Sequence, residues 1–143
     1  MAETQNYKNH TMFDPPFHFF LVPVGLAALI WAIVGVIQHP NWMSGAHVLA
    51  IFWLVLLLFK TRIYSLKVQD RVIRLEERLR LQSVLPAAMQ PRINDLSVDQ
   101  LIGLRFASDA ELPGLVEKTL AGNWNRKQVK EAIQNWRADN WRI

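Results

Sequence analysis

The chain has 143 residues, a formal net charge of +4 and no cysteine, which excludes disulfides, thiolate metal sites and cysteine nucleophiles. Residues 17–59 contain no Asp, Glu, Lys or Arg, whereas about a quarter of the residues in a soluble domain are charged. This composition argues against a water-soluble fold, and we expect the uncharged stretch to lie in lipid.

Residues 1–16 form a polar arm ahead of the first apolar segment, and two explanations for it remain open. Asp14 and the aromatic residues that follow it fit an interfacial anchor, with the carboxylate near the positive end of a helix dipole. Alternatively, the arm packs against the second helix or against a partner. Both explanations place the arm in the cytoplasm.

The first transmembrane helix is expected over residues 17–37, because about 20 apolar residues cross the hydrocarbon core. Pro23 lies inside it and predicts a local kink. A cleaved signal peptide is disfavoured, since the preceding segment is not basic and the sequence Gln38-His39-Pro40 is not a cleavage site. Residues 38–44 are expected to form a short outside loop.

The second transmembrane helix is expected within residues 45–85. Its apolar run, 46–59, is short for a span. It becomes long enough if the helix begins near Trp42 and ends near Tyr64, with flanking basic side chains reaching the headgroups. A re-entrant or buried helix is the alternative. The residues assigned to the lipid interface are Trp42, Lys60, Arg62, Tyr64 and Lys67.

The basic residues predict the orientation of the two spans. Fifteen of the sixteen Lys and Arg residues follow the second span, one precedes the first, and the connecting loop has none. Because basic residues are enriched on the cytoplasmic side, both termini should face the cytoplasm of a bacterial cytoplasmic (inner) membrane. The partner predicted first is therefore the lipid bilayer.

No Gly or Pro occurs between Phe59 and Val84, so the second helix should continue into the cytoplasm as one rod. Acid-first pairs spaced by four residues, Asp70–Arg74 and Glu76–Arg80, are expected to stabilise it. Apolar residues recur along the rod at steps of four, three and four, as in a coiled-coil seam; they are Val68, Val72, Leu75 and Leu79. Two heptads are too few to establish a coiled coil. The stripe nevertheless predicts that a second copy, or the chain's own C-terminal tail (residues 86–143), covers these residues.

Residues 86–143 are expected to form a cytoplasmic subdomain of short helices. Ser97 can cap one helix, and Ser108 with Glu111 predicts a capping box for a helix that stops at Gly122. A second capping box, Asn125 with Gln128, opens a final helix. Its predicted apolar face contains Val129, Ala132, Ile133 and Trp136. The fold class is therefore all-α: a transmembrane helical hairpin whose second helix continues as a cytoplasmic rod, plus a small C-terminal helical subdomain.

Three histidines near the membrane, His18, His39 and His47, are the weak candidates for binding a cofactor. His18 should lie at the cytoplasmic interface and His39 at the outer one, so one chain cannot offer both as axial ligands to one haem. Interfacial hydrogen bonding is the favoured role. We expect no cofactor and no metal site.

No catalytic constellation emerges from the sequence. Ser108, Asp109 and Glu111 resemble an active-site cluster, but a helix cap explains them. Tryptophan and basic residues alternate near the end of the chain, as in proteins that bind anionic lipid or nucleic acid. However, the net charge of residues 86–143 is only +1, which argues against nucleic acid. No small-molecule substrate is evident.

Several strings resemble a family of small bacterial two-span membrane proteins known only as a domain of unknown function. They are NYKNH and DPPFHFF near the start, LKVQDRVIRLEERLR at residues 66–80, LRFASDAEL at 104–112 and WRAD at 136–139. The resemblance covers essentially the whole chain. It implies bacterial origin and a membrane location, and it supplies no activity, substrate or cofactor.

The sequence therefore predicts a non-enzymatic membrane scaffold or accessory subunit, which self-associates or docks in a larger membrane complex. The residues assigned to self-association or docking are Val68, Val72, Leu75, Leu79 and Trp136. One alternative is a haem- or quinone-associated electron-transfer subunit that uses the histidines. Another is a protein that senses anionic lipid through its basic juxtamembrane segment.

Overall fold

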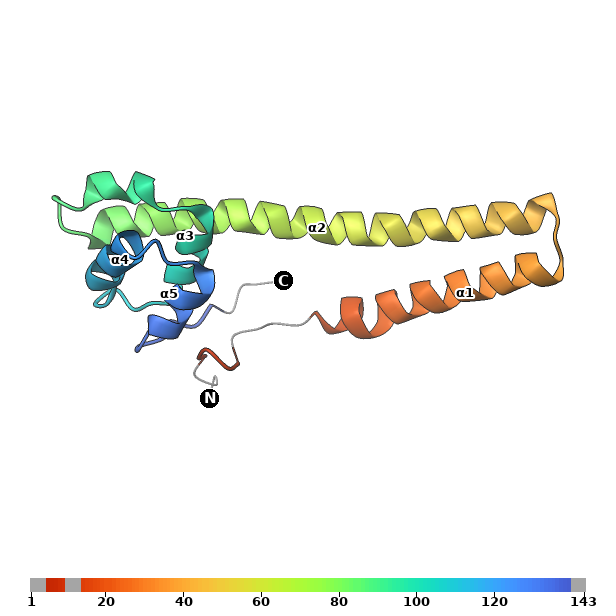
Figure 1. The fold of residues 1–143 in the computed structure, drawn as a ribbon, viewed down its shortest axis with the longest axis horizontal. Coiled ribbons are helices and arrows are strands. Elements are labelled where there is room, and N and C mark those ends of the chain that lie inside the picture. The colour runs from red at the N-terminus through yellow and green to blue at the C-terminus, as the bar shows by residue number, and fades with distance from the viewer. Residues whose placement is uncertain (1–4, 10–13, 140–143) are drawn as a thin grey trace. The chain divides into compact units, whose positions relative to one another are not determined.

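A computed structural model describes residues 5–9 and 14–139 (Figure 1). Within these residues the chain is helical and forms no β-strand, as the sequence predicts. The elements in chain order are η1 (Pro16–Leu21), α1 (Val22–Gln38), α2 (Trp42–Val84), η2 (Gln90–Asp95), α3 (Val98–Leu104), α4 (Leu112–Ala121) and α5 (Arg126–Ala132). The described residues divide into two compact units, one of 14–66 and one of 5–9 with 67–139.

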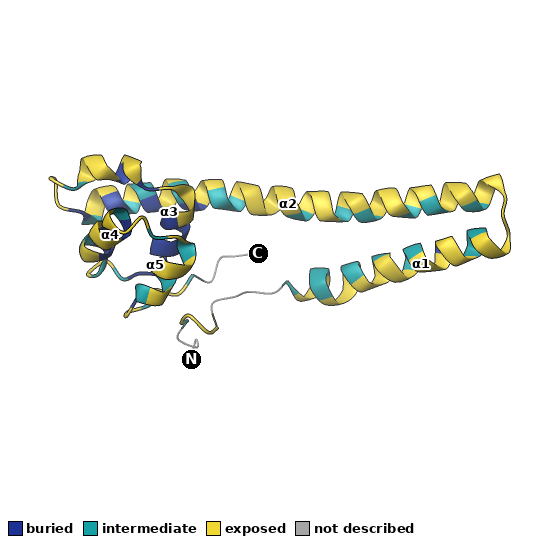
Figure 2. Cartoon of the chain, viewed as in Figure 1, coloured by how far each residue is buried: buried dark blue, intermediate teal, exposed yellow. Residues whose placement is uncertain are grey.

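The first unit contains two helices that are long and apolar enough to cross a membrane, Pro16–Gln38 and the start of Trp42–Val84. Only 6% of the residues in the apolar window of each helix are buried within the chain. The core helix of a soluble protein would instead be mostly buried. In Figure 2 the ribbons of α1 and of the apolar part of α2 are almost entirely yellow and teal, the colours of exposed and intermediate residues. Many of the exposed residues in these helices are large and apolar.

The first apolar helix begins with a π-helical turn, η1, and continues as α1. Pro23 lies in the first turn of α1, and η1 ends two residues before it. Proline has no N–H and crowds the preceding turn, so a widened turn at this point accommodates the ring. The kink predicted from Pro23 stays a prediction, and the irregularity that the structure shows is the π-helical turn before this residue.

The loop between the two helices is closed by a reciprocal cap. The Asn41 side chain accepts a hydrogen bond from the Ser44 N–H at 2.9 Å, and the Ser44 hydroxyl oxygen accepts one from the Asn41 N–H at 3.1 Å. This arrangement satisfies backbone donors that a helix start leaves free. It places the beginning of α2 at Trp42, three residues before the predicted boundary at 45 and at the start that makes the short apolar run long enough for a span.

The other end of the first unit is held by a charged and aromatic contact. Arg62 Nη1 lies 3.2 Å from Asp14 Oδ2, and the guanidinium stands 5.3 Å from the centre of the Phe17 ring. Phe17 in turn packs edge-on against Phe59. Asp14 also accepts a hydrogen bond from the Phe17 N–H. The carboxylate thus acts at a helix start, as expected, and it also joins that start to α2.

The second unit is a small helical domain built on the last turns of α2. Its core contains Leu81 of α2, Leu85 directly after that helix, and apolar side chains from every later helix (Figure 2). The fully buried side chains from this later part of the chain include Leu101, Leu104, Phe106, Leu112, Val116 and Val129. Because α3, α4 and α5 are short, burial against α2 supplies part of the core that they need.

The helix caps of the second unit agree with the sequence at two positions and differ at a third. Ser97 and Gln100 form a capping box at α3, and Asn125 and Gln128 form one at α5. The capping box predicted for Ser108 and Glu111 is wrong, because α4 begins only at Leu112 and has no side-chain cap. The Glu111 carboxylate instead accepts hydrogen bonds from the backbone N–H groups of Gln134 and Asn135.

The last helix is shorter than the predicted one. α5 ends at Ala132, Ile133 is extended, and Trp136 forms an isolated β-bridge with Ala107. Two backbone hydrogen bonds define this bridge, from Ser108 N–H to the Asn135 carbonyl and from Arg137 N–H to the Phe106 carbonyl. Trp136 therefore reaches the core from an extended segment and not from a helical face.

Candidate interaction site

The charged part of α2 presents two opposite faces, and the tail covers one of them. Ile73, Glu77 and Leu81 are spaced by four residues and are 7%, 5% and 0% exposed. Residues with this spacing lie on one side of a helix. The tail packs on this side, so a carboxylate is buried between two aliphatic residues.

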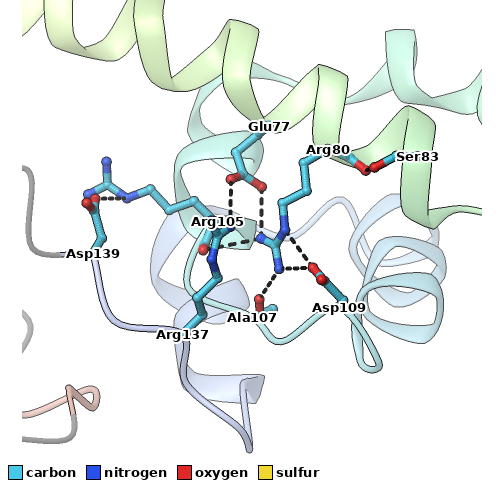
Figure 3. Close-up of polar contacts among 8 residues, drawn as sticks. All are labelled: Glu77, Arg80, Ser83, Arg105, Ala107, Asp109, Arg137 and Asp139. Carbon is cyan, nitrogen blue, oxygen red and sulfur yellow. Dashed lines mark hydrogen bonds and ion pairs between the residues drawn. The ribbon is translucent and has the colours of Figure 1, made fainter.

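Arg80 fastens a loop of the tail to this covered face (Figure 3). Its Nη2 donates to the Ala107 carbonyl at 2.6 Å, and its Nε donates to Asp109 Oδ1 at 2.8 Å. Its Nη1 lies 3.2 Å from Glu77 Oε2. The planar guanidinium thus bonds with two carboxylates and a backbone carbonyl. A lysine could not replace it, because the ammonium group has fewer donors and they are not held in a fixed plane.

Glu77 is the most deeply buried carboxylate of this cluster. Burial raises the pKa of Glu77 above its ordinary value of 4.5, and nearby arginines, Arg80 foremost, oppose that rise. Arg137 contributes a more distant contact at 3.9 Å. With 5% exposure, the carboxylate has no access to a substrate, which a catalytic acid or base requires. We assign this cluster to holding the tail on α2.

Arg105 and Phe106 extend the cluster to the β-bridge. The Arg105 guanidinium stands 4.5 Å from the Phe106 ring centre and pairs with Asp139 at 3.4 Å. The Phe106 ring lies 5.1 Å from that of Trp136. Trp136, which the sequence assigns to docking, therefore packs against the core of its own chain.

The opposite face of α2 is open. Val68, Val72, Leu75 and Leu79, called the seam from here on, are 60%, 48%, 61% and 58% exposed. The tail, one of the two coverings predicted for the seam, lies on the other side of the helix. Four exposed aliphatic residues in one row form an apolar surface of the kind that marks an interaction site.

The charged residues around the seam do not pair as predicted. Within residues 14–139 neither an Asp70–Arg74 nor a Glu76–Arg80 ion pair forms. Arg80 turns instead toward Glu77 and Asp109. Glu76 lies beside the seam on the exposed side of α2, and so does Arg71. Both charges are thus available to a partner.

The three histidines are spread along the first unit. The ring Nδ1 of His18 lies 2.9 Å from the Asp14 carbonyl oxygen in the first turn of the helix. His39 caps the far end of α1, so about 20 residues, or roughly 30 Å of helix, separate the two. His47 is exposed on α2. Among the described residues no group of three His, Asp or Glu side chains is arranged to hold a metal ion.

The residues assigned to the lipid interface have different surroundings. Trp42 and Tyr64 are 79% and 56% exposed, and Lys60 Nζ stands 5.6 Å from the centre of the Tyr64 ring. Lys67 is exposed as well. Arg62, by contrast, is engaged by Asp14 with a side chain only 14% exposed. Arg62 therefore belongs to the internal contact described above.

The described part of the polar arm contacts the tail. The side-chain oxygen of Gln5 accepts a hydrogen bond from the Asp139 N–H at 2.8 Å, and Asn6 and Asn9 form a turn with their own backbone. The arm thus has a contact within the second unit, at the residue that also pairs with Arg105. Residues 10–13 lie outside the described part.

Sequence reasoning missed the cluster of Glu77, Arg80, Arg105 and Asp109. One signal was present: Ile73, Leu81 and Leu85 form a second apolar row at steps of four, interrupted only by Glu77. A carboxylate inside such a row predicts a buried partner. The identity of that partner depends on the tail fold, which the row alone does not reveal.

A family model described as a family of unknown function (DUF6526) matches residues 1–143. The match covers the whole chain, and the chain belongs to this family. No curated protein and no solved structure matches it.

Proposed function

We propose that this member of the DUF6526 family is a non-enzymatic scaffold or accessory subunit of the bacterial cytoplasmic membrane, which self-associates or docks in a larger membrane complex. Its two apolar helices would anchor it, with both termini in the cytoplasm. The distribution of Lys and Arg supports this orientation, because fifteen of sixteen follow the second apolar segment.

The observation that carries the proposal is the exposed seam on α2. The folded tail covers the opposite side of the same helix, whereas these four apolar residues remain exposed. Each aliphatic side chain gains about 1.5–3 kcal/mol when it is fully removed from water. An assembly partner would provide this burial.

The use of the charged side chains supports a non-catalytic role. Glu77, Arg80, Asp109 and Arg105 hold the tail together, and Glu111 binds backbone N–H groups. The most strongly buried acid, Glu77 of α2, is covered by the tail. These charged groups therefore stabilise the fold of the tail and its contact with α2.

The proposal is tested by measuring the mass of the native assembly. The full chain, extracted in mild detergent, should have a mass above that of one chain, and mass spectrometry should identify what co-purifies. Replacing two seam residues, V72S with L75S, should lower the mass to that of one chain. Val98 on α3 is also exposed, at 40%, so V98S serves as the matched control and should leave the assembly intact.

A wild-type chain that is monomeric in mild detergent and in native membranes, with nothing co-purifying, would overturn the proposal. An assembly that persists in the V72S/L75S variant would show that the seam is not the surface that carries it.

A further inference from the structure

The seam has the spacing of coiled-coil core positions. The steps of four, three and four place Val68 and Leu75 at d positions, and Val72 and Leu79 at a positions. Val at a with Leu at d, as at Val72 and Leu75, favours two strands when the helices are parallel. The spacing thus fits one further helix.

The charges that flank the seam are complementary to those of a second copy. On this assignment Arg71 occupies a g position and Glu76 the next e position. In a parallel pair a g residue lies beside the e residue five positions later in the other helix. Arg71 of each copy would therefore meet Glu76 of the other copy, forming two symmetric ion pairs.

An antiparallel pair lacks this complementarity. With Val68 opposite Leu79, it would bring Arg71 of one copy beside Arg78 of the other, and Glu76 beside the uncharged Gln69. Like charges at such positions are destabilising. The flanking residues therefore select the parallel arrangement.

The residues one heptad before the seam are compatible with close helix approach. Thr61 and Ser65 take the corresponding positions, and both are exposed. Their hydroxyls donate to the carbonyls of Leu58 and Thr61, at 2.8 and 2.9 Å. Because these donors are satisfied within the helix, covering them leaves no unpaired hydroxyl.

We infer that the seam is occupied by a second copy of this chain, in a parallel pair with Arg71 of each copy against Glu76 of the other. This inference rests on the proposed membrane anchoring, because copies inserted in the same orientation present α2 with the same polarity. Confinement to one membrane also raises their effective concentration, which lets a short seam suffice. The tail remains in place, since it covers the opposite face.

Single cysteines test the pairing and its polarity, and the chain has no cysteine of its own to interfere. V68C and L79C, introduced separately into the full chain, should each form disulfide-linked dimers when native membranes are oxidised. K67C, an exposed position off the seam, is the control and should not cross-link. In an antiparallel pair, V68C would link only to L79C in a mixture of the two variants, which would overturn the parallel arrangement.

Charge reversal tests the predicted register. R71E and E76R each place like charges together and should lower the cross-linking yield of V68C by roughly 2- to 20-fold. The double variant R71E/E76R restores both ion pairs and should recover the yield. Equal yields in all four chains would overturn the assigned contact.

The two proposals fail in different ways. If V68C and L79C form no homodimers while the V72S/L75S substitution still reduces the mass of the assembly, another protein occupies the seam. The second copy is then excluded and the scaffold role stands. If no assembly exists at all, both proposals fall.

Discussion

Arg80 joins the tail to α2 through several directed polar contacts. It binds Glu77 on its own helix and both Asp109 and the Ala107 carbonyl on the loop before α4. The side chains of Arg80 and Glu77 are only 12% and 6% exposed, so water screens this pair little, whereas the side chain of Asp109 is 67% exposed. The loop conformation therefore depends on one guanidinium.

Replacing Arg80 should destabilise the tail strongly. R80M leaves Glu77 buried without its nearest partner, and breaking a buried pair in this way costs about 3–5 kcal/mol. The matched control is R92M, because the Arg92–Asp95 pair is exposed and such pairs contribute about 0–1 kcal/mol. Chemical denaturation of the full chain in detergent, followed by far-UV circular dichroism, measures both. A loss of under 1 kcal/mol in R80M would contradict the assigned role.

Glu77 should make the stability of the tail depend on pH. Since burial raises its folded pKa above 4.5, the folded chain binds more protons than the unfolded chain between 4.5 and the folded value. The contribution of Glu77 to stability is then fully present below 4.5 and is lost as pH rises through the folded pKa. Because the glutamine side chain of E77Q does not titrate, this variant does not lose the contribution. We therefore expect the difference in free energy of unfolding, E77Q minus wild type, to increase as pH rises through this window.

The measurement is a series of denaturation curves from acidic to neutral pH. E117Q removes an exposed carboxyl from α4 and serves as the control, with a pH profile that should follow the wild type. A constant difference between E77Q and the wild type across the whole range would contradict the prediction.

At the scale of elements, α3 and α5 pack closely at Gly103. A Cβ atom at this position would lie 3.0 Å from both Cβ and Cγ1 of Val129. This distance is tighter than ordinary van der Waals contact, and Val129 is fully buried. The valine thus has little room to move, so glycine is required here by packing.

G103A should therefore destabilise the second unit by about 1–3 kcal/mol, the usual cost of overpacking. Gly114 in α4 has no atom within 4 Å of an added Cβ. G114A should stabilise its helix by about 0.5–1 kcal/mol, because alanine loses less backbone entropy. Opposite signs for the two variants, measured by thermal unfolding, would confirm the contact. A stabilising effect of G103A would show that α3 and α5 are not packed this closely.

The elements could be predicted where local chemistry decides them. The absence of Gly and Pro between residues 59 and 84 predicts the long α2, and the caps at Ser97 and Asn125 satisfy nearby backbone donors. The box at Ser108 failed because the Glu111 carboxylate finds backbone donors 23 and 24 residues away. The predicted end of α5 was wrong for the same reason, because Trp136 pairs with Ala107 in a β-bridge and is not helical. These long-range contacts leave no local pattern.

At the scale of the whole molecule, the proposed membrane topology can be tested at two exposed positions. Pro40 lies in the loop between the apolar helices and Glu117 on α4 of the tail. P40C should react with a membrane-impermeant maleimide in intact cells. E117C should react only after the membrane is permeabilised. Labelling of E117C in intact cells would reverse the orientation and remove the tail from the cytoplasm.

The β-bridge between Ala107 and Trp136 has a consequence for biosynthesis. It completes a core that begins with Leu81 of α2, so this core cannot close until the ribosome has added the segment around Trp136. Both apolar helices have been synthesised well before then, and chains generally fold from the first-made part onward. Under the proposed membrane anchoring, insertion should therefore precede closure of the tail, and a nascent chain halted after α4 would expose Phe106 to chaperones.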